Sequence, residues 1–223
     1  MKDFELKNTA PEDIEDLLVK VEKSFGIKFI SNELTHVQTF GEMCDLIKSK
    51  IRLENADNCT TQQAFYKLRN SIINNLQVDK EQLTPDTSLA DFLPRRTRKT
   101  AIKRIEQDLE FKLSILRPPH FITGFLTLLL LAAFVGLFFN WQFGLSGLVL
   151  AIGGLWVANK KGNELDLKTI GQLAVKMTRE NYLNSRRNPN SYNDLEIEKI
   201  LTGWFSDDLA IDKSNLNREA RLN

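Results

Sequence analysis

The chain has 223 residues, of which 26% are charged, and a formal net charge of +1 at pH 7. This balance excludes proteins that attract nucleic acid or membranes through the overall field of the molecule, so any electrostatic recognition must be local. The length accommodates one large domain or two small ones. The two cysteines, Cys44 and Cys59, lack metal-ligand spacing. They predict free, buried thiols, with a disulfide as the alternative.

The N-terminal segment, 9–52, has the pattern of short amphipathic helices, with apolar residues at helical spacing from Ile14 to Phe25. Capping boxes, in which a threonine and a Glu or Gln three residues later satisfy the first amides of a helix, occur at Thr9/Glu12, Thr39/Glu42, Thr60/Gln63 and Thr169/Gln172. The polar, acidic start of the chain does not indicate a signal peptide. Because no alternating pattern predicts a strand, we expect the soluble part to be all-α.

Segment 60–113 continues the helical pattern. Apolar residues predict one helix around Leu68 and Ile72 and another around Ile105, with a turn at Pro85 between them. The second helix opens with a basic run. Between residues 94 and 104 there are six basic residues and no acidic one: Arg95, Arg96, Arg98, Lys99, Lys103 and Arg104.

An uncharged stretch of 19 residues follows at 121–139. At ~1.5 Å per residue it reaches about 28 Å, close to the thickness of a bilayer's hydrocarbon core. A second uncharged stretch, 143–158, comes after the tripeptide NWQ. We therefore expect a transmembrane hairpin over 120–158, with spans at 119–139 and 143–158. The alternative is a buried helical hairpin of a soluble protein.

Basic residues flank the hairpin on both sides, and its turn has none. The positive-inside rule then places both termini in the cytosol. We expect an integral membrane protein, of a bacterial plasma membrane. Two pairs of small residues allow the spans to pack closely, within the hairpin or between chains: Ala132/Gly136 and Gly147/Ala151. The hairpin contains no charge, which argues against a channel or a transporter.

The soluble segments repeat each other. Three pairs of segments align: 13–29 with 97–113, 39–43 with 169–173, and 76–89 with 209–222. Their offsets are 84, 130 and 133 residues. The offset increases by 46 residues between the first and second pairs, which is about the length of the hairpin with its flanks. The second copy of the repeat is therefore interpreted as the first copy with the hairpin inserted.

The order of these pieces resembles an acyl carrier protein, a small four-helix domain with a long loop after its first helix. Segment 60–113 resembles the first helix, the loop and the second helix, and 162–183 resembles the fourth helix that completes them. Segment 9–52 resembles the second to fourth helices, and 194–223 resembles a first helix and loop. We expect 194–223 to pair with 9–52, within one chain or by exchange in a homo-oligomer. The alternative is that each end packs separately.

Carrier proteins of this kind attach a phosphopantetheine arm to a serine at the start of the second helix. In the internal copy the aligned position holds Arg95 or Thr97, depending on the alignment, and in the N-terminal copy it holds Pro11. Ser88 lies too early, within the loop. The resemblance therefore implies a degenerate carrier without a prosthetic group or other cofactor.

Three interpretations of the basic run remain open. It attracts anionic lipid beside the membrane, it docks an acidic protein partner such as a true carrier protein, or it packs against an acidic helix start at Glu12, Asp13, Glu15 and Asp16. Nucleic acid is disfavoured as a partner, because no aromatic residue is interleaved with the basic ones.

No catalytic or metal-binding pattern is present. His36 and His120 have no ligand-type residues at suitable spacing, and there is no glycine-rich phosphate loop. We expect neither a metal nor an enzyme activity. The sequence instead favours a membrane-anchored adaptor or scaffold that recruits an unidentified protein partner to the lipid bilayer. The alternative is a membrane-tethered acyl carrier with an atypical acceptor, Thr97 or Ser88, that serves lipid or polyketide-like synthesis.

Overall fold

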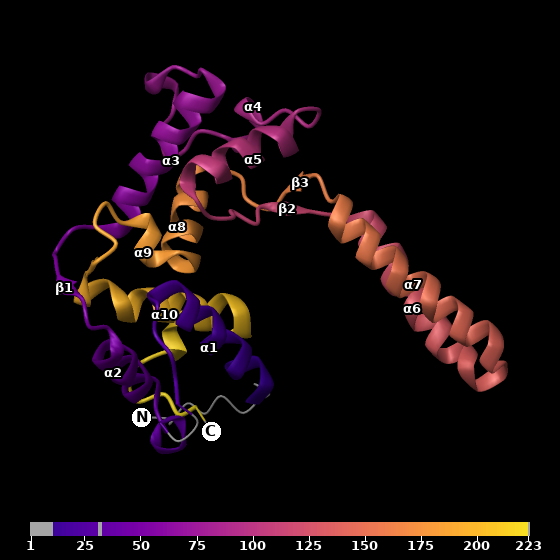
Figure 1. Cartoon of the computed structure of the whole chain (residues 1–223). Helices are drawn as coiled ribbons and strands as arrows, with labels where there is room; N and C mark the ends of the chain where they lie inside the picture. Colours follow the sequence, from indigo (N-terminus) through magenta and orange to yellow (C-terminus); the bar gives the residue numbers. More distant parts are fainter. Residues whose placement is uncertain (1–10, 31–32, 223) are drawn as a thin grey trace. The chain divides into compact units, whose positions relative to one another are not determined.

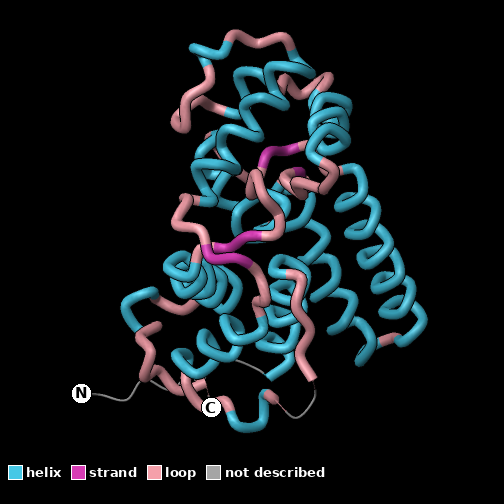
Figure 2. Tube along the Cα trace, turned by 60° about the vertical axis from the view of Figure 1, so that its left-hand side comes forward, coloured by secondary structure: helices cyan, strands magenta, loops and turns pink. Residues whose placement is uncertain are grey.

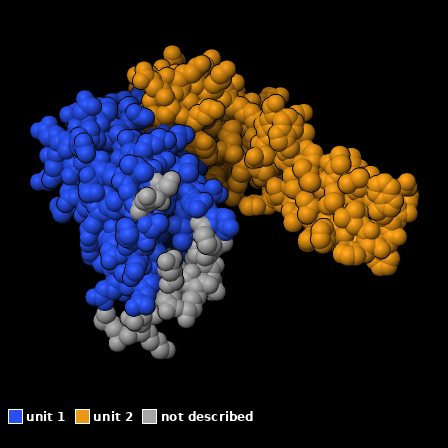
Figure 3. Space-filling view, turned by 60° about the horizontal axis from the view of Figure 1, so that its bottom comes forward, with its two compact units in different colours: residues 1–71, 171–223 blue, residues 72–170 orange. Residues whose placement is uncertain are grey.

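A computed structural model describes residues 11–30 and 33–222 of the chain. The chain forms two compact units (Figure 3): unit 1 contains residues 1–71 and 171–223, and unit 2 contains residues 72–170. The described residues are mostly helical, as the sequence predicted. The strands among them are two residues long, and they tie loops together instead of forming a layer (Figure 2).

Unit 1 is built from both ends of the chain. Its elements are α1 (Pro11–Phe25), the 3₁₀ turn η1 (Leu34–His36), α2 (Phe40–Lys50), β1 (Glu54–Asn55), the first part of α3 (Thr60–Leu76), α8 (Ile170–Glu180), α9 (Tyr182–Ser185), β4 (Ser191–Tyr192), α10 (Asp194–Leu209) and η3 (Lys213–Asn215). Because α3 crosses the boundary between the units, the segment 60–113 lies partly in each of them.

One apolar core joins the N-terminal and C-terminal helices of unit 1. Helices α1 and α2 both pack on α10 (Figure 1). Their side chains share a single buried cluster, which includes Val21, Phe40 and Trp204. The rings of Phe40 and Phe205 meet edge to face, with centroids 5.1 Å apart. Segments from opposite ends of the sequence thus bury their apolar faces against each other within one chain.

Backbone hydrogen bonds close the same junction. The amide of Phe40 donates to the carbonyl of Ala220 at 2.8 Å, and the amide of Leu222 donates to the carbonyl of Gln38 at 2.8 Å. At the same place, Thr39 and Glu42 form the predicted capping box at the start of α2. The box expected at Thr9 lies outside the described residues.

Unit 2 contains the remaining elements. They are the end of α3, η2 (Lys80–Gln82), α4 (Leu89–Phe92), α5 (Arg98–Leu109), β2 (Leu116–Arg117), α6 (His120–Phe139), α7 (Trp141–Lys161) and β3 (Glu164–Leu165). Strands β2 and β3 pair antiparallel. The long α6–α7 hairpin is therefore joined to the rest of unit 2 through a short two-stranded stem.

Repeat-related positions carry the same local structures. Glu22 and Glu106 lie 84 residues apart, and each accepts a hydrogen bond from the amide seven residues later. The bonds come from Phe29 at 2.6 Å and from Leu113 at 2.8 Å. In each copy the carboxylate thus satisfies a backbone amide in the segment that follows the helix.

The backbone turns at repeat-related positions as well. The residue after α1 is Gly26, with φ of 63°, and the C-cap of α5 is Glu110, with φ of 66°. At the other offset, Gln77 after α3 has φ of 55° and Ala210 after α10 has φ of 54°. Left-handed residues of this kind end helices, so the paired helices end in the same way.

The bridge that closes unit 1 also has a counterpart. Thr39 pairs with Arg221 in unit 1, and Thr169 pairs with Ser88 in unit 2. In unit 2 the amide of Leu89 donates to Lys168 at 2.8 Å, in the same manner as the bonds of the first bridge. These paired positions follow the 130- and 133-residue offsets of the sequence repeat.

The hairpin helices are long and apolar enough to cross a membrane, by length and composition. The predicted turn, NWQ, is tighter than expected. Only Asn140 separates the helices, because its side-chain Oδ1 accepts hydrogen bonds from the amides of Gln142 and Phe143 and so starts α7 at Trp141. Most of the large apolar side chains of α6 and α7 remain exposed.

Close packing within the hairpin depends on small residues. A Cβ atom at Gly144 would lie 2.5 Å from the backbone nitrogen of Leu137, and one at Gly147 would lie 2.8 Å from the Cβ of Ala133. Of the residues expected at the contact, Gly136, Gly147 and the buried Ala151 take part, whereas Ala132 is exposed. A Cβ atom at Gly136 would lie 3.7 Å from the Cα of Gly144, and the neighbouring Ala133 takes the place expected for Ala132.

Candidate docking surface

The basic run at the start of α5 does not form a single patch. Arg95 and Arg96 lie in the turn before α5. The other four basic residues lie on the helix, where each step along the chain turns the side chain by about 100°. Three faces result. One is buried, one contacts the base of the hairpin and one borders a groove.

Arg98 occupies the buried face, with an exposed fraction of only 8%. Its Nε donates to the carbonyl of Leu93 at 2.9 Å, and its Nη1 donates to the carbonyl of Asn163 at 2.6 Å. Burial lowers the pKa of this guanidinium, and the nearby charge of Arg95 lowers it further. The expectation that Arg98 faces a partner or lipid is therefore wrong, because its donors are used inside unit 2.

The second face, here called the stem face, consists of Arg95, Lys99 and Lys103 at helical spacing. The Nζ of Lys99 donates to the carbonyl of Lys161, the last residue of α7, at 2.9 Å. The carbonyl of Arg95 accepts from the side-chain amide of Asn163 at 2.8 Å, and its guanidinium lies 3.7 Å from Glu164. Lys103 is exposed one turn further along.

The stem itself is tightly built. Arg117 of β2 pairs with Asp166 at 3.2 Å. A Cβ atom at Gly162 would lie 2.6 Å from the carbonyl carbon of Arg117, so only glycine fits there. Together with the contacts of the stem face, these interactions fasten α5 to the base of the hairpin.

The third face, here called the groove face, consists of Arg96, Thr100 and Arg104. It borders an open groove of about 720 Å³ between the end of α3, the following loop and the start of α5. The apolar lining is formed by Leu76, Val78, Leu83, Phe92, Pro94 and Ala101. The polar lining includes Thr97 and one acidic residue, Asp91. The groove thus has a mixed lining, in which six apolar residues lie beside polar ones and two exposed arginines.

The positions aligned with a carrier serine have separate roles. Thr97 is the N-cap residue of α5, and its exposed side chain makes no capping hydrogen bond. Arg95 belongs to the stem face. Pro11 is the first residue of α1, and its side chain lies outside the described part of the chain. Ser88 caps α4, where its Oγ accepts from the amide of Ala90 at 3.2 Å.

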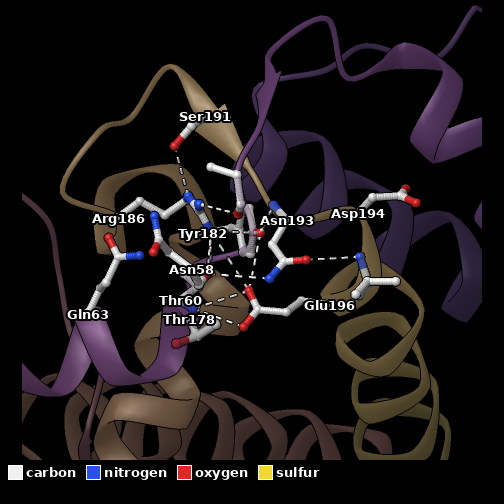
Figure 4. A network of polar contacts seen from close by, with 12 residues as sticks. Asn58, Thr60, Gln63, Thr178, Tyr182, Arg186, Ser191, Asn193, Asp194 and Glu196 are labelled. Carbon is white, nitrogen blue, oxygen red and sulfur yellow. Dashed lines mark hydrogen bonds and ion pairs between the residues drawn. The ribbon is translucent and has the colours of Figure 1, made fainter.

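A buried polar network in unit 1 was not foreseen from the sequence (Figure 4). Its centre is Arg186, which is 1% exposed. The guanidinium donates to the hydroxyl of Thr60, to the carbonyl of Ala56 at 3.1 Å and to the hydroxyl of Ser191 at 3.1 Å. Its partners lie in a loop, in the two-residue strand β4 and at the first residue of α3, so no periodic pattern marked it.

Tyr182 and Glu196 complete this network. The amide of Asn193 donates to the Tyr182 hydroxyl at 2.8 Å, and burial raises the pKa of that hydroxyl. The carboxylate of Glu196 accepts from the amide of Thr60 at 2.9 Å and lies 3.9 Å from Arg186. Every contact joins one chain segment to another, so we interpret the network as a structural clamp around the start of α3.

The cysteines differ from each other. Both are free, but Cys44 is buried and Cys59 is exposed, so the expectation that both are buried is wrong for Cys59. Within residues 11–30 and 33–222, no group of three or more His, Cys, Asp or Glu side chains could hold a metal ion.

Comparison with known proteins adds no relatives: no family model, curated protein or solved structure matches the chain.

Proposed function

We propose that this chain is a non-enzymatic, membrane-anchored adaptor. The α6–α7 hairpin lies in a bilayer, both termini are cytosolic, and carrier-like helical domains recruit a protein partner to the membrane surface. The basic residues that remain exposed on α5 form the recruiting surface.

The junction between α5 and the hairpin carries this proposal. Arg98, Lys99 and Asn163 bind α5 to the residues that follow α7. A helix fastened in this way to the end of a membrane span remains close to the headgroups. The exposed basic residues of α5 are therefore presented at a defined site on the membrane surface.

The distribution of charge supports the orientation. Lys160 and Lys161 occupy the last turn of α7, and the turn at Asn140 has no basic neighbour. By the positive-inside rule the basic end of the hairpin is cytosolic. The Lys160 ammonium also lies 4.9 Å from the ring centre of Trp156, a pairing suited to the headgroup region.

The test is the recovery of partners from native membranes. The variant R96E/K103E/R104E reverses three exposed charges that make no hydrogen bond or ion pair among the described residues. Arg98 and Arg95 are left unchanged because they support the junction. The matched control, K23E/K80E/K199E, reverses three exposed lysines elsewhere.

We expect the α5 variant to co-purify specific proteins at about one-tenth of the wild-type level, a loss of about 1.4 kcal/mol in binding free energy. The control should retain them, as measured by quantitative mass spectrometry. Resistance to carbonate extraction should be equal in all three proteins. Equal recovery of every protein by wild type and α5 variant would contradict the proposal.

One observation favours a second candidate, a membrane-tethered acyl carrier. The Thr97 hydroxyl is exposed at the start of α5 and makes no capping bond. After co-expression with a broad-specificity phosphopantetheinyl transferase, an arm-sized mass increase that T97V abolishes would establish that function. The adaptor proposal expects the unmodified mass.

A further inference from the structure

We propose that the groove beside α5 is the docking site itself, and that its occupant is an amphipathic, acidic α-helix of a protein partner. The inference rests on the adaptor function and adds the place and the chemistry of recognition.

The dimensions of the groove suit side chains from such a helix. Its volume of about 720 Å³ lies within the range of about 300–1,000 Å³ found for ligand pockets. Apolar residues from three elements converge on it: Leu76 from α3, Leu83 from the loop and Phe92 from α4. An amphipathic helix places apolar anchors at i, i+3, i+4 and i+7, which is the pattern that such grooves accept.

The positive charges of Arg96 and Arg104 at the groove favour an acidic partner. Neither Arg96 nor Arg104 has a hydrogen bond or an ion pair within the described part of the chain, and both are exposed. Arg96 lies in the turn before α5 and Arg104 lies on α5 itself, and both line the groove together with Thr100. Carboxylates at helical spacing on a partner can each meet one guanidinium in a charge-assisted hydrogen bond. Asp91 also lines the groove, so it would repel a carboxylate of the partner placed beside it.

Membrane lipid is a poorer match to this site. The stem face contacts the base of the hairpin, so its residues are the ones turned toward the bilayer. The groove face lies about 100° away around α5. A lipid headgroup would also leave the apolar side chains of the groove uncovered.

The experiment uses the full chain in nanodiscs of phosphatidylcholine, which carries no net charge. The ligand is a fluorescent helical peptide of about 14 residues with Leu at i, i+3, i+4 and i+7 and Glu elsewhere. Its control has Gln in place of every Glu, and a second control has Ala in place of every Leu. Binding is measured by fluorescence anisotropy.

We expect the Glu/Leu peptide to bind at least tenfold more tightly than either control peptide. R96E/R104E should lose at least tenfold in affinity. The matched variant K23E/K199E changes the net charge equally at exposed residues outside the groove and outside α5, and it should bind nearly as well as wild type. F92A, which trims the apolar lining and retains the charge, should weaken the Leu peptide while circular dichroism stays unchanged.

Three results would overturn the inference: no binding of the Glu/Leu peptide, equal losses in R96E/R104E and K23E/K199E, or displacement of the peptide when phosphatidylglycerol is added to the nanodisc. The last would assign the groove to anionic lipid. If partner recovery depends on α5 but the peptide does not bind, the adaptor function stands and the groove is not its docking site. If the peptide binds but no protein co-purifies, the groove binds acidic helices and the adaptor function is wrong.

Discussion

The Nη1 of Arg98 donates to the carbonyl of Asn163 at 2.6 Å, across 65 residues of sequence that contain the entire hairpin. This one bond links the first turn of α5 to the residue pair that follows α7. Arg98 is therefore a buried part of the junction between α5 and the hairpin, and not a surface charge.

Replacing Arg98 should therefore loosen the stem. R98M removes donors from two backbone carbonyls, and hydrogen bonds to charged groups contribute about 1.5–3 kcal/mol each. We expect unit 2 to lose about 2–4 kcal/mol of unfolding free energy. Hydrogen exchange should detect this as faster exchange of the Asp166 amide, which donates to Ile115 at 2.9 Å.

R96M is the matched control, because Arg96 is exposed and neighbours Arg98 in sequence. Its effect should remain within about 0.5 kcal/mol. Equal exchange of the Asp166 amide in R98M and R96M would show that the junction does not depend on the buried guanidinium.

The repeated carboxylates should contribute equally to their own helices. In E22A and E106A the amides of Phe29 and Leu113 lose their acceptors, at a cost of about 1–3 kcal/mol each. Because the two sites share no partner, the double variant should show the sum of the single effects. Chemical denaturation in detergent measures all three variants.

E22Q and E106Q provide the controls, since glutamine keeps an acceptor oxygen. They should lose less than the alanine variants. A large effect at one site and none at the other would argue against structural equivalence of the two positions.

The hairpin contact should tolerate bulk at one glycine and reject it at another. A Cβ at Gly144 meets the backbone of Leu137, whereas at Gly153 nothing lies within 4 Å. G144V should separate the helices at a cost of about 1–3 kcal/mol and lower the thermal midpoint in detergent. G153V should leave that midpoint unchanged, and a fall of equal size in both variants would contradict the packing described.

The two thiols should differ in reactivity. Burial raises the pKa of Cys44 to about 12, so at pH 8 its reactive thiolate fraction is about 10⁻⁴. Iodoacetamide should label Cys59 alone in the folded protein and both thiols after unfolding. Mass spectrometry of wild type and C59S measures this, and labelling of folded C59S would show that Cys44 is accessible.

The raised pKa of Cys44 also predicts how the stability of the protein changes in alkaline solution. The thiol of the unfolded chain ionises at lower pH than the buried one. The unfolding free energy should therefore fall between about pH 9 and pH 12, and C44A should reduce this fall.

Local patterns in the sequence predicted the helical class, the capping box at Thr39 and the two apolar helices, because each depends on residues within a few turns of one another. The fate of Arg98 was not predictable in this way. Within the run it is indistinguishable from Arg96, and its burial depends on a carbonyl 65 residues away. Arg186 was missed for a similar reason. Its partners include the backbone carbonyl of a loop residue, and every residue has such a carbonyl, so no residue type predicts the contact.

The joining of the two chain ends in unit 1 sets an order of events during synthesis. Helices α1 and α2 emerge first, but α10, which covers their apolar faces, emerges last. Residues 51–193, including the whole hairpin, are made in between. At about 5–20 residues per second this takes roughly seven to thirty seconds. Throughout that interval the apolar faces of α1 and α2 that later pack on α10 remain uncovered, while the hairpin has already been synthesised.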